Sequence, residues 1–161
     1  MSTFKDASPA DLATIEELLG RPLAGRCAVV VRRVDGRPVV IENEPHLRDG
    51  TPMPTLYWLV DRDLHDAVSR LESEGGVHRF EALVDEAELQ NTHDRYALKR
   101  RNATLRHDLA QASGGVGGTR VGVKCLHAHL ANYLVNGNDP VGELVAHALE
   151  VPPLTIEDIR G

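Results

Sequence analysis

Aromatic residues are scarce in this 161-residue chain, which has one Trp, two Phe and three Tyr. Its core must therefore be built mostly from Leu, Val and Ala. Only two cysteines are present, Cys27 and Cys125. Two are too few for a disulfide framework, so we expect free thiols in a reducing compartment. No apolar run approaches the roughly 18–20 residues that a membrane span needs, so no membrane partner is expected.

Positive charge is also in deficit. The formal net charge of −6 excludes a molecule that attracts nucleic acid as a whole, so an anion site needs a local cluster of cations. Residues 1–10 show no cationic start followed by an apolar segment, and hence no secretory signal. The expected location is the cytoplasm.

The overall composition is ordinary for a globular protein, with 42% hydrophobic and 26% charged residues. A chain of this length is expected to form one domain with a substantial core. We place a single α+β domain at residues 1–150. A polar C-terminal tail over residues 151–161, which starts near two prolines, need not be ordered.

Three segments have strand character. Residues 26–33 and 37–42 are rich in β-branched residues and flank an Asp-Gly turn signal, which predicts a β-hairpin. Residues 55–60 are almost continuously apolar, which favours a strand covered on both faces. The predicted fold is therefore a small, mainly antiparallel sheet of about three strands covered by helices.

Helices are predicted between and after these strands. Ser8 and Asp61 are N-cap residues for two of them. A long helical region covers residues 81–112, and its two apolar phases do not join cleanly at residues 91–93, which indicates a kink or two helices. Two shorter helices are expected at residues 124–135 and 141–149.

Reactive side chains crowd at the start of the first of these shorter helices, where Cys125, His127 and His129 follow Lys124. On a helix, Cys125 and His129 share a face, whereas His127 points about 160° away from His129. All three converge only if the segment is extended or is just beginning its helix. Such a thiol suits a nucleophile or a soft metal ligand, and the alternative is a buried Cys beside hydrogen-bonded histidines.

A metal site has less support from spacing. Structural zinc sites use four ligands in paired spacings, and the remaining His and Cys residues are scattered without pairs. We therefore expect no bound metal and no cofactor.

A basic cluster offers a binding surface instead. Residues 95–106 contain five cations and no acidic side chain. A glycine-rich loop at residues 113–118 follows, and its backbone amides could approach a phosphate; the alternative is a mobile linker. Residues 117–124 are not a phosphate loop, because a Val separates the last Gly from the Lys. The candidate anion-binding residues are Arg101, Arg106, Arg120 and Lys124.

Several uncommon strings recur in a known family. Residues 50–59, the Leu-Glu pair at 71–72, the Lys-Cys-Leu-His string at 124–127 and the Asp-Pro-Val-Gly string at 139–142 resemble the bacterial DUF501 family. The family has no established activity, so the resemblance implies none. Its members carry further cysteines at positions that align with Arg33, Asp35 and Asp61. The resemblance thus implies that an ion pair of Arg33 with Asp61 or Asp35 replaces a metal crosslink, and that the hairpin, Asp61 and Cys125 lie close together.

Three functional hypotheses follow. The first is a non-catalytic binding or regulatory module for an anionic ligand, such as a nucleotide, a phosphorylated metabolite or RNA. The alternative is a thiol-dependent enzyme in which Cys125 is the nucleophile, His127 or His129 the base and Lys124 the anion stabiliser. A further alternative is a metal-binding protein with a degenerate site. Association into a homo-oligomer is left open.

Overall fold

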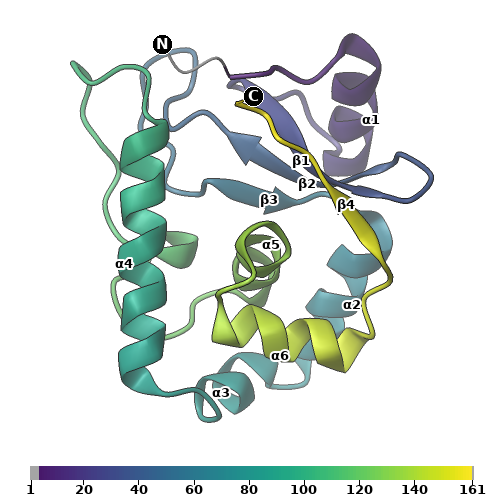
Figure 1. The fold of residues 1–161 in the computed structure, drawn as a ribbon, viewed down its shortest axis with the longest axis vertical. Coiled ribbons are helices and arrows are strands. Elements are labelled where there is room, and N and C mark those ends of the chain that lie inside the picture. Colours follow the sequence, from purple (N-terminus) through teal and green to yellow (C-terminus); the bar gives the residue numbers. More distant parts are fainter. Residues whose placement is uncertain (1–3, 161) are drawn as a thin grey trace.

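The computed structural model describes residues 4–160 (Figure 1). Its centre is a four-stranded antiparallel sheet in the order β3-β2-β1-β4. The strands are β1 (Cys27–Arg33), β2 (Pro38–Asn43), β3 (Tyr57–Leu59) and β4 (Leu154–Ile156). The predicted α+β fold and hairpin are thus confirmed, with four strands where about three were expected.

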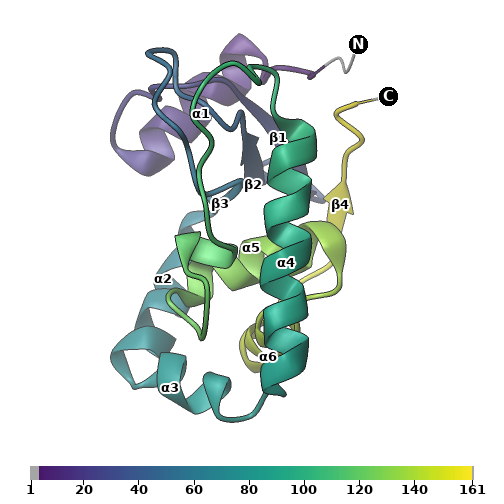
Figure 2. The ribbon, with the colours of Figure 1, turned by 90° about the vertical axis from the view of Figure 1, so that its left-hand side faces the viewer.

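Helices cover both faces of this sheet. They are α1 (Pro9–Leu19), α2 (Arg62–Ser73), α3 (Gly76–Glu81), α4 (Glu86–Ala103), α5 (Leu126–Asn136) and α6 (Pro140–Leu149), with a short 3-10 turn η1 (Val116–Gly118). α1 lies on one face, and α5 packs under the other, against β3, α6 and α2 (Figures 1 and 2). No helix of residues 4–160 is both long and apolar enough to cross a membrane.

Local capping chemistry explains where four helices begin. Each has a Ser or Asp at its N-cap whose side chain accepts a hydrogen bond from the backbone N–H three residues later. These caps are Ser8, Asp61, Asp85 and Asp139. Ser8 and Asp61 were predicted in this role.

The sheet separates two hydrophobic cores. Because side chains alternate along a strand, Tyr57 and Leu59 join the large core beneath α5, whereas Trp58 joins the smaller core with Ile15 of α1. The strand covered on both faces is therefore confirmed, although it is three residues long rather than six.

The long helical region differs from the prediction. It is interrupted at residues 82–85, where Asp85 caps α4, and α4 then continues without a break through residues 91–93. The kink was predicted because the apolar residues change phase at this point. The buried face of α4 is nevertheless continuous, because it includes the polar side chains of Thr92, His93 and Arg100. Residues 104–112 are not helical.

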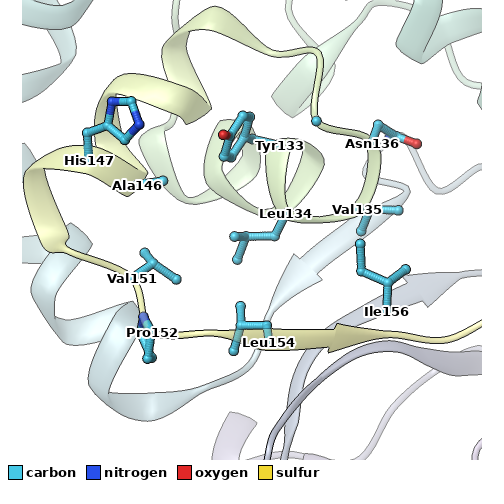
Figure 3. Close-up of a pocket in the computed structure, with 11 residues that line it drawn as sticks. Tyr133, Leu134, Val135, Asn136, Ala146, His147, Val151, Pro152, Leu154 and Ile156 are labelled. Atoms are coloured by element: carbon cyan, nitrogen blue, oxygen red, sulfur yellow. The ribbon is translucent and has the colours of Figure 1, made fainter.

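The C-terminal segment belongs to the sheet. Leu154–Ile156 pairs with β1, Ile159 is buried, and the Arg160 side chain pairs with the buried Glu42 carboxylate. The sequence did not predict this strand, because three residues, Leu-Thr-Ile, carry little local signal. Leu154 and Ile156 also form one wall of an apolar groove of about 500 Å³ against α5 and α6 (Figure 3).

Candidate functional site

The start of α5 brings two predicted site residues together. Cys125 is the N-cap of α5 and has an extended backbone, with φ −149° and ψ 123°. Its side chain therefore does not follow the helical phase that would place it beside His129. Instead, Cys125 Sγ lies 3.8 Å from Nδ1 of His127 in the first turn.

A third side chain, Glu72 near the end of α2, completes the cluster. Its Oε1 lies 3.3 Å from His127 Nδ1, and its Oε2 accepts a hydrogen bond of 2.8 Å from the Leu126 N–H. The ligand atoms of Glu72, Cys125 and His127 all lie within 4.8 Å of one another, and the three residues are half-buried. Glu72 was not predicted as a site residue, because only the packing of α2 against α5 brings it there.

Contacts on the far side of the His127 ring fix its tautomer. His127 Nε2 lies 3.0 Å from the backbone carbonyl of His65 and 3.1 Å from Ser69 Oγ, whose own proton goes to that carbonyl. Since a carbonyl only accepts, Nε2 carries a proton; in the neutral ring the Nδ1 lone pair then faces Cys125 and Glu72, and in the charged ring Nδ1 donates to Glu72. A carboxylate and a lone pair 3.3 Å apart repel each other unless a proton or a cation lies between them.

The surroundings of the Cys125 thiol raise its pKa. Burial raises its pKa, which outweighs the opposing N–H groups of Ala128 and His127, and the Glu72 charge raises it further. A thiol with a raised pKa is largely protonated at neutral pH and attacks poorly. This environment disfavours the thiol-enzyme hypothesis.

His129 does not join this cluster. It is fully buried, and its Nδ1 donates to the Asp139 carboxylate at 2.8 Å. Asn132 and the Gly142 N–H donate to the same carboxylate at 3.0 Å each. Within residues 4–160, His129 Nε2 has no hydrogen-bond partner. His129 therefore does not converge with Cys125 and His127, and its contacts belong to the junction of α5 and α6.

Within residues 4–160, no hydrogen bond or ion pair links the four predicted anion-binding residues to one another. Arg106 donates to the Leu47 carbonyl and lies 3.6 Å from Glu44, so it is engaged in packing. Arg101 is exposed at the end of α4, while Arg120 and Lys124 are exposed in the loop before α5. Anion binding by these four residues stays a prediction.

Two carboxylates occupy the N-terminal end of α5, where a phosphate was considered. Glu81 accepts a 2.5 Å hydrogen bond from the Val123 N–H, and Glu72 accepts from Leu126. Because these N–H groups already have charged acceptors, they are not free to cradle a phosphate.

The glycine-rich loop is packed against α4. The buried Arg100 guanidinium donates to the carbonyls of Gly114 and Ala112, and a Cβ on Gly115 would lie 2.4 Å from the His93 Cβ. These contacts hold the segment against α4, and Gly115 allows the close approach of the two backbones.

Comparison with known proteins identifies the family. Residues 29–147 match the family described as protein of unknown function DUF501. The chain belongs to the DUF501 family. The matched region contains Glu72, Cys125 and His127. No curated protein and no solved structure matches the chain.

In this DUF501 chain the expected ion pair at the hairpin is present. Arg33 Nε and Nη2 donate to the two oxygens of Asp61 at 2.5 and 2.8 Å. Burial would raise the pKa of Asp61, but Arg33 and the Leu64 N–H outweigh it and lower that pKa. Cys125 is not part of this contact. Its sulfur lies beside Glu72, eleven residues, or about 16 Å, further along α2.

Proposed function

We propose that this chain binds a divalent transition-metal ion, zinc by preference, between α2 and α5 through Glu72, Cys125 and His127. The separations of the donor atoms carry the proposal. A tetrahedral zinc ion at ordinary bond lengths places its N, O and S ligand atoms about 3.4–3.6 Å apart. The Nδ1–Oε1 and Nδ1–Sγ separations are 3.3 and 3.8 Å, and all three ligand atoms lie within 4.8 Å of one another, so small side-chain movements would bring them to this spacing.

The donor set also favours this type of metal. Thiolate and imidazole ligands select zinc and related ions over magnesium and calcium. The Nε2 hydrogen bond of His127 to the His65 carbonyl is the outer contact that orients a metal-binding histidine. Three protein ligands leave a fourth position for water or a ligand, as in zinc sites that perform chemistry. We therefore favour a site that binds and polarises a ligand over a purely structural one.

An anionic ligand is the second part of the proposal. Lys124 is exposed and directly precedes Cys125, and Arg120 is exposed in the same loop. A metal ion, with the Lys124 cation adjacent in the chain and Arg120 four residues before it, would favour a phosphate or carboxylate group at the fourth position. This keeps the anionic ligand inferred from the sequence but assigns it to two of the four cations.

Zinc stoichiometry tests the metal site. We expect the wild-type chain, stripped with a chelator and titrated with zinc, to bind about one ion per chain. Cys125→Ser and His127→Ala should lose more affinity than the about 10–100-fold that loss of an outer contact costs, because they remove ligands. Cys27→Ser is the matched control, since Cys27 is buried in the smaller core, and should bind like the wild type. Equal zinc affinity of Cys125→Ser and the wild type would refute the site.

Cobalt substitution tests the anionic ligand separately. Inorganic phosphate should change the visible absorption of the cobalt-loaded chain, with an affinity that falls as salt is raised. Lys124→Ala should weaken this response, while Arg101→Ala, at the distant end of α4, should not. A spectrum that phosphate leaves unchanged would reject the anionic ligand and leave the metal site standing.

A further inference from the structure

A second pocket lies on the α1 face of the sheet, away from the metal cluster. It has a volume of about 160 Å³ and opens beside Trp58, between the segment after α1 and the end of β2. Leu23, Leu47 and Met53 supply apolar walls, and Asn43 and Glu44 supply polar ones. Since Trp58 packs with the smaller core, this pocket is independent of Glu72, Cys125 and His127.

Glu44 is the unusual member of the lining. It is only 7% exposed, and within residues 4–160 its carboxylate forms ion pairs but no hydrogen bond of ordinary length. Arg106 Nε and Arg26 Nη1 lie 3.6 and 3.9 Å from its oxygens, close enough to balance the charge but too far for hydrogen bonds. Arg106 Nε, which is itself without a hydrogen-bond partner in residues 4–160, is the nearer of the two, so these loose ion pairs leave the Glu44 carboxylate able to accept shorter hydrogen bonds from a ligand beside the pocket.

Trp58 supplies the second element of recognition. The exposed Arg21 guanidinium lies over its ring, 5.1 Å from the centroid. A guanidinium is a planar, delocalised group, and a planar heterocycle stacks on an indole in the same manner. Because Arg21 is at the surface, its side chain can move aside and leave this face of the indole to a ligand.

We propose that this pocket binds a purine base whose edge carries a ring N–H beside an amino group, as guanine does. The base would stack on Trp58 in the place of the Arg21 guanidinium, and its two donors would bind the two oxygens of Glu44. A base without these donors leaves the buried carboxylate with only its two loose arginine contacts and is therefore disfavoured. The pocket volume suits a single base rather than a larger ring system.

Trp58 also provides the assay, because it is the only tryptophan of the chain. Titration with guanosine should change its fluorescence in a saturable way. Adenosine has the same ring size but lacks the paired donors, and should bind about tenfold or more weakly. Absence of a saturable change with guanosine, or equal binding of adenosine, would overturn the proposal.

Substitutions distinguish specific hydrogen bonding between the base and Glu44 from nonspecific stacking of the base on Trp58. Glu44→Gln should weaken guanosine binding about tenfold or more, whereas Glu17→Gln on the exposed side of α1 should leave it unchanged. Because Glu44 lies between two arginines, its variant is checked by thermal unfolding. Ala24→Phe, at an exposed position of the pocket lining, should block binding without disturbing the core. Guanosine affinity that survives Ala24→Phe would refute this location.

Discussion

Replacing Asp139 by alanine is expected to lower the free energy of unfolding by about 3–5 kcal/mol. The Asp139 carboxylate is fully buried and accepts hydrogen bonds from His129, Asn132 and the Gly142 N–H. Alanine would leave all three donors buried without an acceptor and would remove the cap of α6. Chemical denaturation followed by circular dichroism measures the loss.

Asp85→Ala is the control for this prediction. Asp85 also caps a helix through a hydrogen bond to the N–H three residues later, but it is exposed. Its removal should cost only about 1 kcal/mol, the usual value for an N-cap. If the two alanine variants were equally stable, the buried network around Asp139 would contribute nothing beyond the cap.

The second large effect is expected at Gly142. In an ordinary helix, Gly to Ala stabilises by about 1 kcal/mol. Here a Cβ would lie 2.3 Å from the His129 carbonyl oxygen and 2.4 Å from the Tyr133 Cβ, because α6 crosses α5 at this residue. We therefore expect Gly142→Ala to destabilise by about 3 kcal/mol, the upper part of the range for overpacking.

Glu143→Ala, at the neighbouring position of α6, is the control for Gly142→Ala. Glu143 is exposed on α6, so its replacement should change the free energy of unfolding by no more than about 0.5 kcal/mol. A Gly142→Ala variant as stable as the wild type, measured in the same denaturation experiment, would show that α5 and α6 can separate without cost. The Asp-Pro-Val-Gly string at 139–142 thus has a structural explanation: a buried cap, a helix-starting proline and a close approach.

Local signals in the sequence were sufficient for much of the fold. The hairpin and the starts of α1 and α2 were predicted because turn residues and N-caps act within a few residues. The uninterrupted course of α4 was missed because its buried face includes Thr92 and His93. β4 was missed because its three residues gain their stability from pairing with β1, which the local pattern cannot show.

In the candidate site, too, residues marked by local sequence signals were predicted, and residues that only tertiary packing brings together were not. Cys125 and His127 were found from their residue types and their place at a helix start. Glu72 was not, because a carboxylate on α2 is indistinguishable from a solvated one until α2 meets α5. His129 was grouped with the reactive residues by proximity in the chain, whereas its partner Asp139 comes from the next helix.

The late position of β4 has a consequence for biosynthesis. The Arg32 side chain of β1 donates a hydrogen bond to Glu157, which lies 125 residues later in the chain. The ion pair of Glu42 likewise requires Arg160, near the end of the described residues. During translation this edge of β1 stays unpaired until residues 154–157 have been synthesised. Contacts between residues so far apart in the chain form slowly, so the pairing of β1 with β4 is expected to follow the local β1–β2 hairpin.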